Sequence, residues 1–428
     1  MLRSAVLLLA LAAAAGAQAQ GSTNYGSIYS LYGLGERSEF ASSQAAMLGN
    51  GGAALRSSVY TNLSNPALWS DQVLTTFSAA GRITTVRGVD DLSDDPSVGT
   101  SGDVAGVLLG VPLYAGRLGL VLSYQPYSRV NYRSASTGTL DAEGTPVGYT
   151  LNLEGGGGLQ QLSGGLGLRL GSALQVGARA DVILGTDEDV QRTAFDTTST
   201  AFAPTRRSRS TRVSGVTATV GAAGTARSLL GDDDALTVGA ALTFPTALSV
   251  VRTTTLGESL SRDTLTTTQD GDATLPLLLR GGVAYRAGSR WLATVDALYE
   301  PWGGFESTVP VGGFDPAAGV DALRDRLRVG GGVEVSPGGD RRAVARTALR
   351  LGGYAERGLY APEGQGVTTY ALTGGLSVPN RLTGSRIDLG FEVGTRGSTE
   401  GVLVRDTFVK GTLTLNFGER WFVRRRFN

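Results

Sequence analysis

Apolar and polar residues alternate with a period of two in about fourteen segments of this chain, and charge is confined to one side of the alternation. From residue 386 the sequence reads Arg-Ile-Asp-Leu-Gly-Phe-Glu-Val. Successive side chains of a strand point to opposite faces, so the apolar face would carry Ile387, Leu389, Phe391 and Val393. The chain repeats this pattern through most of its 428 residues, with 63 glycines, no cysteine and almost no helical periodicity. We therefore predict an all-β fold, a transmembrane antiparallel β-barrel of about 14 strands.

The first residues have the composition of a secretory signal. Arg3 supplies a positive charge, residues 5–15 form an apolar run, and Ala17-Gln18-Ala19 fits a cleavage site. The run is shorter than the roughly 20 residues of a spanning helix, and no later run reaches about 18. We predict a signal peptide over residues 1–19 and export to the outer membrane of a Gram-negative-type cell.

Charge and missing residue types exclude several function classes. Lys+Arg and Asp+Glu each number 38, which argues against a nucleic-acid partner. The chain has no histidine and no cysteine, so Ser-His-Asp, Cys-His and histidine-containing metal sites are excluded. No phosphate-binding loop motif is present. We expect neither an enzyme nor a cofactor or metal. Four acidic clusters lack the spacing of a calcium site and are interpreted as solvated loop or turn charges: Asp90-Asp91, Asp94-Asp95, Asp187-Glu188-Asp189 and Asp232-Asp233-Asp234.

Short and long connectors alternate between the predicted strands. Those strands lie near residues 72–86, 102–113, 117–131, 159–170, 173–187, 211–227, 235–252, 269–286, 290–301, 323–336, 343–356, 367–378, 385–396 and 402–417. Tight turns such as Gly171-Ser172 alternate with longer polar stretches at 186–210, 252–270 and 303–322. Short turns at one rim and long loops at the other are typical of outer-membrane barrels. An even strand number places both chain ends at the short-turn rim.

The polar faces of the strands carry charges of both signs. On the lipid face an Arg or Lys near the midplane would cost about 2–4 kcal/mol, so these charges are predicted to face the lumen. The alternative interpretation of each charged residue is a solvated or ion-paired side chain of the wall that contacts no ligand. The predicted lumen-facing residues are Arg179, Asp181, Asp296, Arg328, Glu334, Arg350, Asp388 and Glu392.

Residues 20–70 do not follow the alternation of residues 71–428. They are rich in small residues and contain a Gly-Gly-Ala run and an Asn-Pro-Ala turn. We predict that this segment is a hatch or plug that enters the lumen of the barrel formed by 71–428. A periplasmic tail is the alternative. The residues of the predicted hatch motif are Gly51, Gly52, Asn62, Asn65, Pro66 and Ala67.

The Gly-Gly-Ala and Asn-Pro-Ala motifs just before the first strand resemble the FadL family of outer-membrane transporters for long-chain fatty acids and hydrocarbons. Two later stretches, from Leu275-Pro276 to Trp302 and Glu419-Arg420-Trp421-Phe422, resemble divergent members. The resemblance implies a fourteen-stranded barrel with a lumenal hatch, an apolar pocket, and lateral ligand release at an inward kink of the third strand. Pro126 lies in the predicted third strand and lacks the amide hydrogen of a ladder bond, so we predict a wall distortion there.

We predict passive uptake of hydrophobic small molecules. The expected partners are such a ligand, outer-membrane lipid and lipopolysaccharide, and the barrel assembly machinery during biogenesis. The Asn-Pro-Ala signature also occurs in a barrel group tied to protein secretion, so a shuttle or scaffold in a secretion system is an alternative. A general porin is a further alternative.

Overall fold

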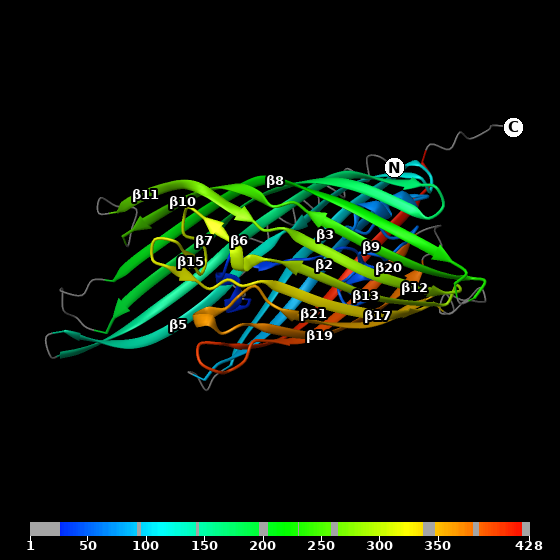
Figure 1. Cartoon of the computed structure of the whole chain (residues 1–428). Coiled ribbons are helices and arrows are strands. Elements are labelled where there is room, and N and C mark those ends of the chain that lie inside the picture. Colours follow the sequence, from blue (N-terminus) through cyan, green and yellow to red (C-terminus); the bar gives the residue numbers. More distant parts are fainter. Residues whose placement is uncertain are drawn as a thin grey trace.

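The chain folds into a closed antiparallel β-barrel (Figure 1). The computed structural model describes residues 26–91, 96–142, 145–196, 204–229, 231–257, 264–336, 347–379 and 385–421. The predicted signal peptide, residues 1–19, lies outside the described residues. No helix of the described residues is long and apolar enough to cross a membrane.

Fourteen wall strands make up the barrel, and three of them are each built from two consecutive elements. In order around the wall they are β2 (Thr75–Val89), β3 (Ser97–Tyr114), β4 (Leu118–Pro126) with β5 (Ser128–Ala142), β6 (Thr145–Leu170), β7 (Leu174–Phe195), β8 (Thr205–Arg227), β9 (Asp234–Thr243) with β10 (Thr246–Leu256), β11 (Leu265–Leu275) with β12 (Leu278–Ala287), β13 (Trp291–Glu300), β17 (Arg326–Val335), β18 (Ala348–Arg357), β19 (Thr368–Pro379), β20 (Arg386–Arg396) and β21 (Arg405–Glu419). β21 pairs with β2, with Thr75 opposite Glu419, and this pairing closes the barrel. The predicted number of strands is confirmed.

Apolar side chains cover the outer surface of the wall. On β13 the alternation places Trp291 and Tyr299 outward, with 53% and 37% of their surface exposed, whereas Asp296 on the opposite face is 6% exposed. On β20 the four apolar residues from Ile387 to Val393 are likewise exposed. A barrel in a membrane needs an apolar outer band to contact lipid, and these outward faces supply it. The polar side chains of the same strands point into the barrel.

Several wall strands continue well beyond this apolar band. Two polar stretches expected as loops, 186–210 and 252–270, are largely strand, because β7 runs to Phe195, β8 begins at Thr205, and β10 and β11 pair through their threonines. The predicted strand 159–170 likewise begins earlier, at Thr145. β-Branched threonine favours strands, and no lipid imposes apolar alternation there. The expectation of loops was therefore wrong, and Asp187 to Asp189 lie in β7.

The N-terminal segment, residues 26–74, contains η2 (Ile28–Leu31), β1 (Glu36–Arg37), α2 (Ser43–Ala46) and η3 (Pro66–Asp71). Its blue ribbon lies among the wall strands in Figure 1. A second segment, between β13 and β17, meets it at an isolated bridge between Gly33 and Gly312. That segment carries η4 (Trp302–Gly304), β14 (Glu306–Ser307), β15 (Phe314–Asp315) and β16 (Val320–Asp321), and the β18–β19 connection carries η6 (Pro362–Gly364).

Candidate functional site

The structure places all eight predicted lumen-facing charges on the inner side of the wall, and seven of them bind the N-terminal segment. Asp181 is the eighth, and it pairs with Arg179 at 2.9 Å. The seven contacts are Arg179 to the Leu63 carbonyl (2.7 Å), the Ala53 amide to Asp296 (2.7 Å), Arg328 to Glu39 (2.6 Å), Gln44 to Glu334 (2.6 Å), Arg350 to the Tyr60 hydroxyl (3.1 Å), Ser43 to Asp388, and Asn50 to Glu392 (3.1 Å). These charges therefore hold the segment within the lumen.

The Asn-Pro-Ala motif holds the second half of the segment against the wall. The Asn65 side chain donates to the Ala53 carbonyl (2.8 Å) and to the Ala222 carbonyl of β8 (3.0 Å), and it accepts from the Ala67 amide (3.0 Å). Ala67 is fully buried, and η3 begins at Pro66. An asparagine side chain at a helix start satisfies an amide that has no helical partner.

The Gly51-Gly52 pair allows the segment to lie close to the wall. A side chain at Gly51 would overlap the Asp296 carboxylate. Gly52 has a φ of +131°, which favours glycine, and its carbonyl accepts a hydrogen bond from Asn62 at 2.7 Å. The six motif residues thus lie together, and a gating role for them stays a prediction.

Replacing Gly177 of β7 with alanine should weaken the docking of η3. An added Cβ would lie 2.5 Å from the Ala67 amide nitrogen, and overpacking of this kind costs about 1–3 kcal/mol. We expect the temperature at which the barrel loses its folded electrophoretic mobility to fall. Gly224→Ala on β8 is the matched control, since no described atom lies within 4 Å of its added Cβ. Equal temperatures for both variants would contradict the tight docking.

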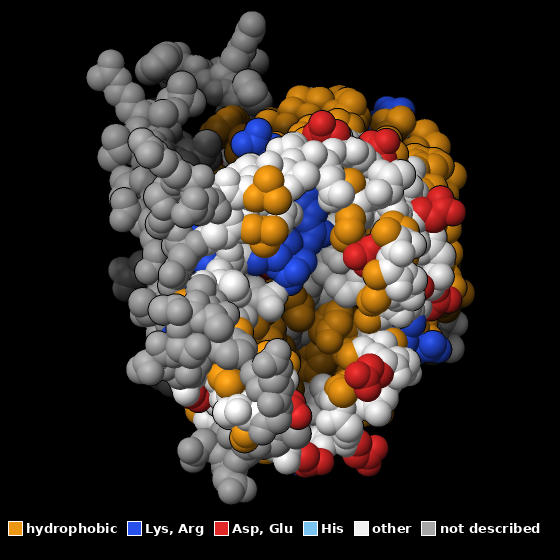
Figure 2. All heavy atoms as spheres, turned by 90° about the vertical axis from the view of Figure 1, so that its left-hand side faces the viewer, with side chains coloured by type: hydrophobic (Ala, Val, Ile, Leu, Met, Phe, Trp, Pro, Cys, Tyr) orange, Lys and Arg blue, Asp and Glu red, His pale blue; other side chains and the backbone are white. Residues whose placement is uncertain are grey.

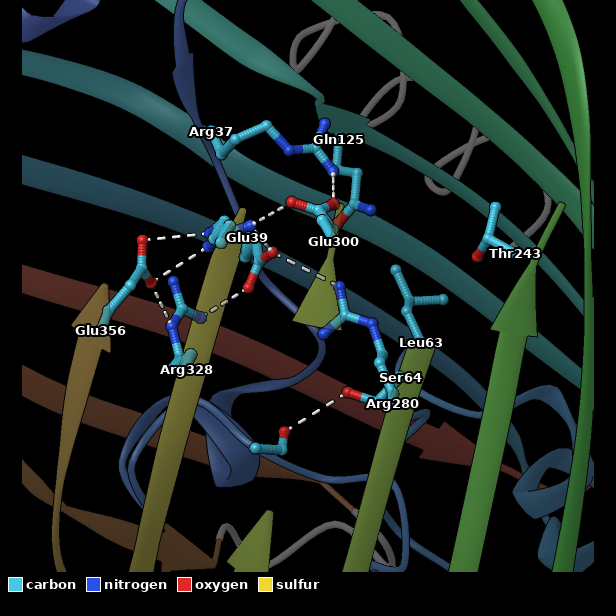
Figure 3. Close-up of polar contacts among 12 residues, drawn as sticks. Arg37, Glu39, Leu63, Ser64, Gln125, Thr243, Arg280, Glu300, Arg328 and Glu356 are labelled. Atoms are coloured by element: carbon cyan, nitrogen blue, oxygen red, sulfur yellow. Dashed lines mark hydrogen bonds and ion pairs between the residues drawn. The ribbon is translucent and has the colours of Figure 1, made fainter. Parts of the chain in front are cut away.

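A cluster of four arginines and three glutamates joins the segment to four wall strands, β12, β13, β17 and β18 (Figure 3). Arg326, only 1% exposed, donates to Glu39 (2.9 Å), Glu300 (3.0 Å) and Glu356 (3.0 Å). Arg328 bridges Glu39 and Glu356 at 2.6 and 2.5 Å. The remaining members of this arginine–glutamate network are Arg37, which pairs with Glu300, and Arg280, which pairs with Glu39.

Glu39 is the point at which the segment enters this network. It lies in the N-terminal segment and outside the spanning strands, and three wall arginines surround it. Although burial raises its pKa, Arg326, Arg328 and Arg280 hold the pKa of Glu39 well below its usual range. Its carboxylate is therefore charged at neutral pH, and it holds the segment electrostatically.

The third wall strand is interrupted after Pro126. β4 pairs with β3 only between Val107 and Tyr114, and no described residue of β5 pairs with β3. Ser128 and Arg129 pair instead with β1 of the segment, so the strand bends into the lumen. An ion pair between Arg129 and Asp103 of β3 bridges the two sides of this break. That the break borders a transport route stays a prediction.

The spaces between segment and wall are small. A cavity of about 70 Å³ borders the arginine–glutamate network, and another of about 70 Å³ lies behind the break between β3 and β5. An apolar cavity that holds benzene has about 150 Å³. Both cavities are lined by several charged side chains. The apolar pocket implied by the family resemblance is therefore not open between the described residues of the segment and the wall; a wide apolar hollow of about 790 Å³ lies instead over exposed wall residues such as Val295, Val329 and Leu372.

Apolar side chains fill the outer part of the lumen instead. They come from the wall, the N-terminal segment and the segment between β13 and β17, and all of them are buried. We call this cluster the outer core; it includes Tyr29, Val213, Leu248, Val250, Trp302 and Phe305. The barrel is thus sealed by packed side chains at its outer end and by ion pairs below them.

The fourteen-stranded barrel shares its fold with several solved structures. Similar solved structures are the monoaromatic hydrocarbon channel CymD (TM-score 0.57, 14% identity, 91% of this chain and 99% of that one) and the Ralstonia pickettii toluene transporter TbuX (0.54, 14%, 90% and 99%). A Pseudomonas aeruginosa FadL homologue is similar too (0.56, 12%, 89% and 98%). These similarities confirm the predicted FadL-like fold.

The family itself is defined by a match over the whole chain. The family model described as BamG matches residues 1–428, and the chain belongs to the BamG family. No curated protein sequence matches the chain. The family differs in name from the one that the motifs resemble, although the fold is of the FadL type.

Proposed function

We propose that the protein takes up hydrophobic small molecules, long-chain fatty acids or aromatic hydrocarbons, passively across the outer membrane. The observation that carries the proposal is the break in the wall, where β5 leaves β3 and pairs with the segment inside the lumen. A solute released at this level would enter lipid sideways without crossing the polar lower lumen. The relatives of similar fold named for hydrocarbons support this solute class.

The proposal requires the N-terminal segment to move. The cavities of about 70 Å³ are smaller than the roughly 150 Å³ that holds benzene, so a hydrocarbon needs displacement of β1 or of the outer core. The segment would then act as a hatch, with the glycine and asparagine motifs as its lower anchor. A general porin fits less well, because the same packing fills the path that ions would take.

The proposal also implies where the protein is located in the cell. A cleaved signal over residues 1–19 would export the chain to the outer membrane of a Gram-negative-type cell. The apolar band would contact lipid and lipopolysaccharide, and the barrel assembly machinery would insert the chain.

Ser101→Trp should slow uptake, because Ser101 of β3 lines the cavity behind the wall break. An indole at this position would fill the exit, and we expect the initial rate for labelled toluene or oleate to fall by roughly an order of magnitude. Thr100→Trp is the matched control, because Thr100 is next to Ser101 in sequence but is exposed on the other face of β3. Equal rates for both variants and the unchanged protein would remove the lateral route.

A second function is favoured by the family assignment and by the sealed lumen. The name BamG suggests a relation to barrel assembly, and hydrogen bonds and ion pairs hold the segment to β7, β13 and β17. A closed barrel also suits a scaffold in an assembly or secretion complex, because a scaffold needs no open lumen.

Depleting the protein from cells separates the two functions. For an uptake channel, entry of toluene or oleate should fall while the amounts of other outer-membrane barrels stay constant. For a scaffold, those barrels should decrease first, and uptake per remaining barrel should not change.

A further inference from the structure

The inner surface of the wall changes from apolar to basic where β8 and β10 leave the apolar band. Along β10, Leu248 and Val250 are fully buried in the outer core, and the next inward residue is Arg252. Along β8, Val213 is followed in the same direction by Thr211, Arg209 and Arg207. Figure 2 views this end of the barrel and shows basic side chains beside a hollow with hydrophobic side chains at its floor.

Strand register brings the three arginines together. Arg209 lies opposite Thr254, two residues from Arg252, and Arg207 lies two residues further along the same face. Diagonal neighbours in a sheet are about 7–8 Å apart at their Cα atoms, a distance that arginine side chains readily bridge. The three guanidinium groups therefore share one patch, which we call the mouth cluster.

The mouth cluster has too few negative partners among the described residues. Asp189 pairs with Arg209 at 2.7 Å, but no described carboxylate forms an ion pair with Arg207 or Arg252. Arg252 is only 7% exposed and donates to the Pro310 carbonyl. The buried Nε of Arg207 has no hydrogen-bond partner among the described residues. A buried cation without a counterion is costly, so the arrangement favours an anion.

The mouth cluster carries an excess of positive charge. Its three arginines face Asp189, and Asp315 acts on Arg252 from the segment between β13 and β17, which leaves one positive charge in excess. Nearby Asp187 also lies above the apolar band, and burial together with the charge of Asp189 raises its pKa to about 7, so it is largely neutral in mildly acidic solution. Burial, followed by the charge of Arg209, lowers the pKa of Arg207 and of Arg252. An anion would relieve this mutual repulsion.

We propose that the mouth cluster is a binding site for a phosphate group, either free phosphate or the phosphate of a surface glycolipid, held by Arg207, Arg209 and Arg252. Arg209 now donates to Asp189, Arg207 to Gln191 and Arg252 to the Pro310 carbonyl, and the remaining N–H donors of these guanidinium groups, on two neighbouring strands, are of the kind that binds phosphate. The site lies above the outer core and does not depend on the uptake of hydrophobic molecules.

Calorimetric titration of the full-length protein in a neutral maltoside detergent at about pH 6.5 tests the site. The probes are inorganic phosphate, glucosamine 1-phosphate and acetate. We expect both phosphates to bind and acetate to bind about tenfold more weakly, because a carboxylate offers only two acceptor oxygens to the arginines. Tighter binding of glucosamine 1-phosphate would identify a glycolipid headgroup as the source, and equal binding would identify free phosphate. Acetate binding as tight as phosphate binding would overturn the proposal.

Substitutions make the assignment specific. Arg252→Gln should weaken phosphate binding about tenfold, and Arg207→Gln, which leaves the Pro310 contact intact, should weaken it severalfold. Arg212→Gln is the matched control, because Arg212 is exposed on the opposite face of β8. Heat-dependent electrophoretic mobility checks that each barrel is folded. Unchanged phosphate affinity in folded Arg252→Gln and Arg207→Gln proteins would refute the site.

Discussion

Deleting residues 26–71 is expected to convert the sealed barrel into an ion-conducting pore. The segment fills the lumen, and its removal would leave inward charges such as Asp296, Glu334 and Arg350 without their partners from the segment. Glu334 and Arg350 would still pair with each other, but these charges would then border an open space, so the lumen should hydrate. In planar bilayers we expect steady conductance at least roughly tenfold above that of the full-length protein.

The full-length protein in the same bilayer is the reference for this deletion, and heat-dependent mobility shows whether the deleted barrel is folded. A folded deletion protein that does not conduct would mean that the residues between β13 and β17 seal the barrel by themselves. Those residues supply Trp302, Phe305, Val309 and Val311 to the outer core. A second deletion that also shortens this segment would then decide between the two seals.

The sealed state depends on two kinds of packing that respond differently to a solute. The outer core is apolar, so a hydrophobic molecule can replace its side chains without loss of hydrogen bonds. The arginine–glutamate network below it cannot be replaced in this way, because each ion pair that opens leaves buried charge. A hydrophobic solute entering from outside would therefore reach the level of β1 and stop, and the wall break lies at this level.

The sequence predicted the wall well because lipid imposes a simple rule on it. Alternation at Trp291 to Tyr299 and at Ile387 to Val393 reflects an apolar band that every spanning strand must present. Where that rule ends, the prediction failed. The threonine-rich ends of β10 and β11 form strands without alternation, and they were expected to be loops.

The site was predicted only in part, for a related reason. Asp296 and Arg328 were recognised from their strands, and Glu300 and Arg326 continue the same inward phase at the strand ends. The alternation along these two strands therefore predicts that Glu300 and Arg326 also face the lumen. Glu39 has no such signal, since it lies in an irregular segment, and nothing local shows that it meets arginines nearly 290 residues away. Such contacts depend on the closure of the barrel, which brings distant residues together, and the sequence around Glu39 does not reveal them.

Glu39→Gln is expected to loosen the N-terminal segment without unfolding the barrel. The network holds four arginines against three glutamates, and the substitution removes the only carboxylate that the segment contributes to it. Breaking a buried ion pair costs about 3–5 kcal/mol, which raises the population of an undocked segment by roughly a hundredfold or more. Trypsin cleavage after Arg56 of the segment should accelerate accordingly, as long as reclosing is faster than cleavage.

Combining this substitution with Arg328→Gln tests whether the effect is electrostatic. The double variant restores the original excess of one positive charge, so cleavage should be slower than in Glu39→Gln alone. Glu188→Gln, at an exposed position of β7, is the matched control and should leave the rate unchanged. If Glu39→Gln is cleaved no faster than the control, the segment is held chiefly by its asparagine and glycine contacts, and opening would have to begin at Asn65 rather than at the network.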